Sequence, residues 1–220
     1  ASMDHLGEAT REAFGNAHIL CLNAGVSPPT GPMETLTAND WRWTLGVNLW
    51  GVIHGIRVFL PELKAQNEGH IVVTASVAGL TSYPWLGAYN ASKHAVTTIA
   101  ETLYAELQEE GSKVGISCLC PGAVATNIGA AERNRPKELR NDAEVEVDHG
   151  DMTGFAEMFE AIAAKPDAVA ERVLAAVVED RFWIETDELY RVPIRERHRA
   201  IEAREEPPAR GLILAPYLDR

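Results

Sequence analysis

The sequence predicts an α/β protein built on a doubly wound parallel sheet, and two observations carry this prediction. First, three short apolar runs, HILCL, HIVVTA and ISCLC, are ended by Asn23 and Gly25, by a loop that contains Gly79, and by Pro121 and Gly122, respectively. Continuous apolar runs of this length are typical of strands buried on both faces of a parallel sheet. Second, these runs alternate with longer segments of helical spacing, which indicates βαβ units with helices on both faces of the sheet.

The first half of the chain is predicted to contain two helices and two strands. In order, a helix, a strand, a long apolar helix and a second strand are expected at residues 1–16, 17–25, 41–63 and 69–76. The apolar residues of the first helix, Leu6 and Phe14 among them, lie on one stripe that we expect to be buried, and Gly15 ends the helix. Thr37 and Asp40 match a capping box, in which each residue's side chain bonds the backbone of the other, and so mark the start of the long helix.

The second half repeats the alternation. A helix, a strand, a polar acidic segment, a helix and a short strand are expected at residues 89–110, 114–124, 127–165, 167–181 and 182–186. The polar segment has the length of a lid or binding loop, which we expect to shape a substrate site. Residues 191–220 are rich in charge and proline, and we interpret them as a partly helical polar extension without a chemical signal, beyond a domain of residues 1–190.

Composition limits the classes of protein that the chain can belong to. It has 220 residues, of which 46% are hydrophobic and 24% charged, as in one globular domain with a substantial core. The net charge is −12, and no run of lysine or arginine forms the basic stripe that binds a nucleic-acid backbone. No apolar stretch has the roughly eighteen residues of a membrane span, and no secretory signal opens the chain. We therefore expect a cytoplasmic protein without nucleic-acid or membrane partners.

The cysteines and histidines do not predict a metal site. Cys21, Cys118 and Cys120 lie inside apolar runs, where cysteine is usually a small buried hydrophobe. We expect Cys118 and Cys120 to point to opposite faces of one strand, which argues against a shared metal or a disulfide. The seven histidines are scattered without the spacing of metal ligands.

Tyr89 and Lys93 are four positions apart at the start of a predicted helix. Residues with this spacing are neighbours on one helix face, so the pair can act in proton transfer. A tyrosine and a lysine can also share a helix face by chance, and the choice depends on the motifs around them.

Five motifs in register resemble the short-chain dehydrogenase/reductase (SDR) family. They are LNAG at 22–25, VNLWGV at 47–52, TASVAG at 74–79, YNASK at 89–93 and PGAVAT at 121–126. Tyr89 follows Ser76 by 13 positions, which is typical of the family. The resemblance covers residue 1 to about residue 186. It implies a Rossmann-like sheet and an NAD(P)-dependent oxidoreductase that interconverts a secondary alcohol and a ketone or aldehyde.

The resemblance assigns roles to four residues of the reaction centre. Tyr89 is the general acid/base, and Lys93 lowers its pKa by roughly 3 units from an ordinary value near 10 while also holding the nicotinamide ribose. Ser76 orients the substrate oxygen. Asn48 belongs to a water-linked proton relay through the lysine. Outside these motifs, Asn48 would be an ordinary helix amide and Ser76 an ordinary turn serine.

The cofactor implied is NAD or NADP. The resemblance assigns its contacts to Asn23, Ala24, Gly25, Tyr89, Lys93, Pro121, Gly122, Val124 and Thr126. Most of these follow predicted strands, where open α/β sheets bind ligands; alone, they would be turns that end strands. Trp85 and Leu86, together with Ser76, are expected to contact a small apolar alcohol or carbonyl substrate. The family further implies a homodimer or homotetramer.

The sequence departs from the family pattern at its start. The glycine-rich turn TGxxxGxG, on which the family binds a pyrophosphate, does not occur, and neither Gly7 nor Gly15 follows a predicted strand. We therefore expect a piece of a longer polypeptide that lacks the first three strands of the usual seven, with residues 18–23 as an apolar edge. An alternative function is a catalytically silent module for oligomerisation or interaction that has lost dinucleotide binding.

Overall fold

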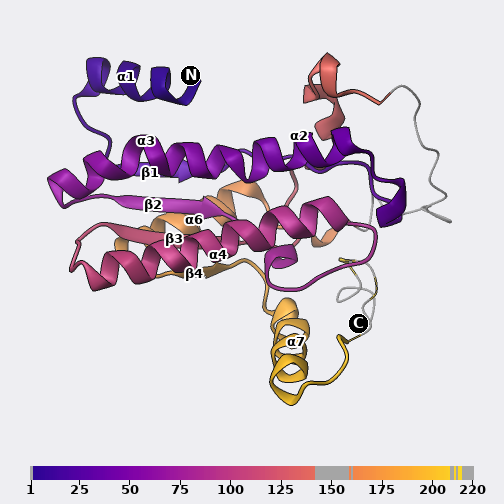
Figure 1. Cartoon of the computed structure of the whole chain (residues 1–220). Helices are drawn as coiled ribbons and strands as arrows, with labels where there is room; N and C mark the ends of the chain where they lie inside the picture. The colour runs from indigo at the N-terminus through magenta and orange to yellow at the C-terminus, as the bar shows by residue number, and fades with distance from the viewer. Residues whose placement is uncertain (1, 142–158, 160, 209–210, 212, 215–220) are drawn as a thin grey trace.

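The computed structural model describes residues 2–141, 159, 161–208, 211 and 213–214, and within them the strands form one parallel sheet. The strands are β1 (Ile19–Leu22), β2 (His70–Thr74), β3 (Gly115–Cys120) and β4 (Trp183–Glu185). They lie in the order β1-β2-β3-β4, and each neighbouring pair is parallel (Figure 1). The predicted α/β fold class is confirmed.

Helices cover both faces of this sheet (Figure 1). The longer ones are α1 (Ser2–Phe14), α2 (Ala38–Asn48), α3 (Trp50–Gln66), α4 (Gly87–Glu109), α6 (Pro166–Val178) and α7 (Arg191–Ala203). Short 3-10 turns are η1 (Met33–Thr35), η2 (Val77–Gly79), η3 (Asn127–Asn134), η4 (Lys137–Leu139) and η5 (Glu188–Tyr190). None of the described helices is both long and apolar enough to cross a membrane.

The alternation of side chains along the strands divides the core into two layers. Ile71 and Val73 of β2 pack with α3 and α4 on one face. Val72, the residue between them, packs with Val169 of α6 on the other face. The sheet is therefore a middle layer, with its carboxyl ends free to carry the loops that form a site.

The capping box is present, but the expected long helix is divided. The Thr37 side chain accepts a hydrogen bond from the backbone of Asp40, and the Asp40 carboxylate accepts one from the backbone of Thr37, as predicted. Leu49, with φ −98° and ψ −56°, separates α2 from α3. The two helices stay nearly collinear in Figure 1, because backbone hydrogen bonds to Leu45 and from Ile53 continue across the break.

Two expectations about burial near the amino terminus are wrong. The strand predicted to be buried on both faces leaves Ile19 55% exposed, and in the described part of the chain β1 pairs with β2 alone. The position of β1 at the end of the described sheet agrees with the separate expectation that residues 18–23 form an apolar edge. In α1, Leu6 and Phe14 are exposed, and the helix contacts α3 through Gly7 instead. A β-carbon on Gly7 would be 2.6 Å from Val58 Cγ1, so close contact of the two helices, not an apolar stripe, sets the buried side.

The expectation for Cys118 and Cys120 is also wrong. Residues two positions apart on a strand share a face, and the two sulfur atoms are in contact at 3.7 Å. Both thiols are free and buried, and the contact with Cys118, together with burial, raises the pKa of Cys120 well above its ordinary value. They fill the core behind the loop that follows β3.

Candidate active site

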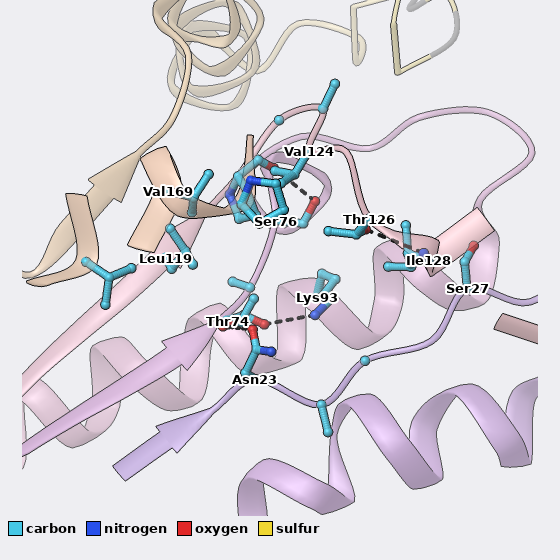
Figure 2. Close-up of a pocket in the computed structure, with 18 of the residues that line it drawn as sticks. Asn23, Ser27, Thr74, Ser76, Lys93, Leu119, Val124, Thr126, Ile128 and Val169 are labelled. Atoms are coloured by element: carbon cyan, nitrogen blue, oxygen red, sulfur yellow. Dashed lines mark hydrogen bonds between the residues drawn. The ribbon is translucent and has the colours of Figure 1, made fainter. Parts of the chain in front are cut away.

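The loops after β1, β2 and β3 meet at the carboxyl end of the sheet and, together with α6 and residues of the sheet, line a partly open cavity of about 980 Å³. This location follows from the parallel topology, since all three strands end at the same edge. Most residues assigned from the sequence lie on its wall: Asn23, Ala24, Gly25, Ser76, Leu86, Tyr89, Lys93, Pro121, Gly122, Val124 and Thr126. Figure 2 shows that they come from segments far apart in the chain.

Tyr89 and Lys93 lie one turn apart on α4, as their spacing predicted. The Lys93 ammonium is 5.7 Å from the centre of the Tyr89 ring. The lysine is 3% exposed, and its Nζ donates a hydrogen bond of 2.8 Å to the carbonyl oxygen of Thr74 at the end of β2 (Figure 2). Burial lowers the pKa of Lys93 to about 8, although the Cys118 and Cys120 thiols oppose this shift.

The expected lowering of the tyrosine pKa by Lys93 is not found. Burial raises the pKa of Tyr89 above its ordinary value, and a hydrogen bond with Ser76 opposes the rise. The ammonium is held by Thr74 at the face of the ring, and so does not compensate for the loss of water around the phenol. Tyr89 is therefore a protonated phenol at neutral pH.

Ser76 is held at the end of β2 by its role as the N-cap of η2. Its Oγ accepts a hydrogen bond of 3.1 Å from the backbone of Ala78 and donates one of 3.5 Å to the carbonyl of Pro121. The serine is 4% exposed but lies on the cavity wall. A hydrogen bond joins its hydroxyl to the Tyr89 phenol, so the two groups lie together on the cavity wall, where a single substrate oxygen could contact both.

Asn48 lies behind the cavity wall and not on it. Its amide bonds both backbone groups of Val26, at 2.8 Å from the N–H and 2.9 Å to the carbonyl, and donates to Ser92 Oγ at 3.0 Å. These bonds use both amide donors and fix the loop after β1 against α4. The geometry supports a positioning role for Asn48 more directly than the proton relay that the resemblance implies.

The residues assigned to the cofactor form two loops on opposite sides of Lys93. On one side, the Asn23 side chain accepts a hydrogen bond of 3.0 Å from Thr74 Oγ1 (Figure 2). On the other side, the backbone of Gly122 donates to Thr186 Oγ1 at 3.0 Å. Thr126 caps η3 through its hydroxyl. Neighbouring strands thus brace both loops.

The two residues assigned to substrate differ in position. Leu86 lies on the cavity wall, whereas Trp85 is not among the lining residues that the structure describes. Trp85 is 49% exposed and has φ +67°, and its carbonyl accepts a hydrogen bond from the backbone of Gly31. Its backbone therefore braces the loop of residues 27–36, while its ring lies at the surface.

Sequence reasoning missed several lining residues: Thr74, Arg133, Tyr190, Ile213 and Leu214. Thr74 had a signal, because it belongs to the TASVAG motif. The others had none. Ile213 and Leu214 belong to the extension that was expected to be chemically silent, yet they line the same cavity as Tyr89.

The segment predicted as a lid is described only in part. Residues 142–158 and 160 lie outside the described residues, so the lid itself stays a prediction. Its first part, residues 127–141, is fixed to α2: Arg135 and Asp40 are buried and form an ion pair of 2.7 Å, and the guanidinium lies 5.0 Å from the centre of the Trp43 ring. No group of three or more possible metal ligands occurs in the part of the chain that the structure describes.

Comparisons with known proteins agree with this geometry. Residues 1–137 match the family model described as short chain dehydrogenase. The chain is 32% identical over 172 residues to an uncharacterized oxidoreductase of Listeria innocua, covering 78% of this chain and 63% of that protein's length. It is 28% identical over 205 residues to the CLA biosynthesis dehydrogenase/reductase of Lactiplantibacillus plantarum, covering 91% and 71% of the two chains.

A solved structure shares the fold closely. It is a short chain dehydrogenase/reductase from Burkholderia phymatum in complex with NAD, 43% identical in sequence with a TM-score of 0.86. The match covers 94% of this chain and 74% of that one.

Proposed function

Because this chain belongs to the short-chain dehydrogenase/reductase family, we propose that it is an NAD(P)-dependent oxidoreductase that interconverts a secondary alcohol and a ketone or aldehyde, with Tyr89 as general acid/base. The convergence of Tyr89, Ser76 and Lys93 on one cavity carries the proposal. Since the chain spans less than two thirds of the Listeria relative, the activity of the whole protein is part of the proposal.

The residues on the cavity wall fit a nicotinamide dinucleotide. Lys93 is buried, and in the described contacts its ammonium, which has three donors, has the single acceptor Thr74. Ligand hydroxyls can satisfy the remaining donors. A β-carbon on Gly25 would stand 3.6 Å from Lys93 Nζ, an ordinary contact, so the protein itself does not require glycine there. Gly25 thus leaves room for a ligand beside the ammonium, as a ribose site needs.

The cofactor would supply or accept the hydride, and the chain supplies the proton. In reduction, the protonated Tyr89 phenol donates to the carbonyl oxygen of the substrate, while Ser76 holds that oxygen by a second hydrogen bond. In oxidation, Tyr89 must first lose its proton, which its raised pKa disfavours. While Lys93 is charged, its ammonium at the face of the ring favours the phenolate, although it does not offset the effect of burial.

Leu86 and the apolar residues around Tyr89 favour an apolar substrate over a charged one. NAD and NADP both remain candidates, since the residue that would contact a 2′-phosphate is not identified. By analogy with the family, we propose a homodimer or homotetramer.

The test is an assay of secondary alcohols with NAD and NADP, and of ketones with the reduced cofactors. Tyr89→Phe should lower kcat by about 10² or more while leaving dinucleotide binding within about twofold, because it removes the proton donor and keeps the ring. Tyr104→Phe is the matched control, since Tyr104 lies on α4 against Phe182. Full turnover by Tyr89→Phe would refute the proton-donor role. Calorimetric titration with both dinucleotides tests the silent module, which micromolar binding would exclude.

A further inference from the structure

We propose that Tyr190 positions residues of the C-terminal extension as an apolar wall of the substrate site, and that this wall selects substrates with a long alkyl or aryl group on the reacting carbon. The inference rests on the proposed function, because it takes the space beside Tyr89 as the substrate site. It goes further by identifying a positioning residue and a substrate class.

The Tyr190 ring is fixed below the loop that follows β3. Tyr190 ends η5 and is 1% exposed. A β-carbon on Gly122 would stand 2.5 Å from its Cε2 atom, so the ring lies directly against the backbone of that loop. Glycine at position 122 is therefore required by the tyrosine, whatever else it contacts.

The Tyr190 hydroxyl connects this loop to the end of the chain. It donates a hydrogen bond of 2.9 Å to the carbonyl oxygen of Ile213, 23 positions later. Figure 1 shows α7 leading away from the sheet, and the hydrogen bond places Ile213, which follows that helix in the chain, back beside η5. The hydrogen bond holds Ile213 at the point of this return.

The returned residues form an apolar surface beside the reaction centre. Ile213 and Leu214 lie on the cavity wall, and Leu214 is 5% exposed. Ile213 and Ile194 pack into one cluster with Tyr190, Leu86 and Tyr89. An apolar group on the reacting carbon would replace water on this surface, which favours its binding by about fourfold per methylene.

A purely structural role for Tyr190 predicts something different. If the residue only filled the core, its ring would suffice and the hydroxyl would matter little. Tyr190→Phe keeps the ring against Gly122 and removes the bond to Ile213. Ile213→Ala keeps that bond, since the acceptor is a backbone carbonyl, and trims the wall itself. Tyr190→Phe therefore tests the hydrogen bond that holds the wall in place, and Ile213→Ala tests the side chain that forms the wall.

The first experiment measures hydrogen exchange in the peptide that contains Ile213 and Leu214. Loss of one buried hydrogen bond should raise its exchange rate about three- to tenfold in Tyr190→Phe. Tyr104→Phe, which removes a hydroxyl from a half-exposed tyrosine on α4, should leave it unchanged. An unchanged rate in Tyr190→Phe would overturn the positioning role.

The second experiment measures dissociation constants of 2-butanone, 2-hexanone and 2-octanone by NMR titration of the full chain. Affinity should rise with chain length in the unmodified chain and in Tyr104→Phe, and the gain should shrink at least threefold for 2-octanone in Tyr190→Phe and Ile213→Ala. The proposed wall would be refuted if affinity depended on ketone chain length equally in all four proteins. It would also be refuted if affinity did not depend on chain length in the unmodified chain. Because no turnover is needed, failure of the proposed function appears separately, as binding without oxidation or reduction.

Discussion

Gly79 of η2 rests directly on the backbone of Lys93, because a β-carbon at position 79 would stand 2.6 Å from the Lys93 carbonyl oxygen. The hydroxyl of Thr97, one turn further along α4, would be equally close at 2.6 Å. Ser76 is the N-cap of η2. The contact between Gly79 and Lys93 therefore sets the distance between Ser76 and Tyr89.

Gly79→Ala should separate η2 from α4 and lower kcat about tenfold or more, with a smaller effect on dinucleotide affinity, because the displaced hydroxyl is that of Ser76. Overpacking of this kind costs about 1–3 kcal/mol of stability. Steady-state kinetics and urea unfolding measure the two effects. Gly46→Ala in α2 is the control, since nothing lies within 4 Å of its β-carbon. Unchanged kcat in Gly79→Ala would contradict this account of the site.

Dinucleotide affinity should depend on the protonation of Lys93. Burial lowers the pKa of Lys93 to about 8, so the side chain is a cation below this pH and loses its charge above it. The dissociation constant of the dinucleotide should rise above about pH 8, and Lys93→Arg should remove the dependence because arginine stays charged. Calorimetric titrations between pH 6.5 and 9.5 measure this. A constant affinity in the unmodified chain across that range would rule out Lys93 as the titrating contact.

Lys93→Met should stabilise the folded chain at pH 7 while abolishing activity. The unfolded lysine has an ordinary pKa of 10.5 and the folded one about 8, so below pH 8 the folded state bears the full cost of a buried cation, about 3 kcal/mol. Loss of the hydrogen bond to Thr74 reduces this gain in stability by about 1 kcal/mol. We expect a net gain of about 2 kcal/mol in urea unfolding at pH 7, declining toward pH 10.5. If Lys93→Met were less stable at pH 7, contacts in the folded chain would already offset the cost of burying the Lys93 ammonium.

Breaking the Asp40–Arg135 pair should destabilise the fold. Burial alone would raise the pKa of Asp40, but hydrogen bonds from Thr37, Arg135 and Asn141 together hold it below its usual value. Arg135→Met leaves the carboxylate buried without its cation, which costs about 3 kcal/mol. Asp40→Asn combined with Arg135→Met should recover part of this loss. Arg140→Met, at an exposed site of the same segment, is the control for urea unfolding. Equal stability of Arg135→Met and the unmodified chain would show that the ion pair is dispensable.

Stability should fall as the pH drops below about 6.5 because of His70. Ser117 Oγ donates to the Arg181 carbonyl, so it accepts its bond of 2.8 Å from His70 Nε2–H. Burial lowers the pKa of His70 from 6.5, although Asp180 opposes the shift. The unfolded state therefore takes up the proton first. Urea midpoints from pH 8 to pH 5 should decline in the unmodified chain, decline more in Asp180→Asn, and flatten in His70→Gln. A flat profile in the unmodified chain would contradict the assignment.

The fold and half of the site could be predicted from the sequence because they depend on local spacing. Tyr89 and Lys93 share a helix face at i and i+4, and Ser76 lies at the end of a strand that its apolar run already marked. Arg135 could not be identified, since a buried arginine inside a polar segment has the pattern of a solvated loop until Asp40 is placed beside it. Tyr190 and Ile213 were missed for a similar reason, because only the tertiary return of the chain brings them together.

Three wrong predictions, on the faces of a strand, the length of a helix and the buried side of another helix, had a different origin. The faces of Cys118 and Cys120 were assigned against the period of a strand, and the sulfur contact corrects this. The break at Leu49 was not predicted because α2 and α3 have one continuous apolar pattern. The apolar residues of α1 were expected to mark its buried side, but Gly7 marks it, since close contact between helices selects small residues over large ones.

The two hydrogen bonds between Asn48 and Val26 divide the β1–α2 connection into two parts that are held by different contacts. Residues 23–26 are pinned before the connection leaves the sheet, whereas residues 27–36 are held mainly from the other side, through Gly31 and the Trp85 carbonyl. Residues 23–25 and 27 line the cavity, whereas residues 28–35 are not among its described lining residues. The part of the connection on the cavity wall is therefore held independently of the part that leads on to α2.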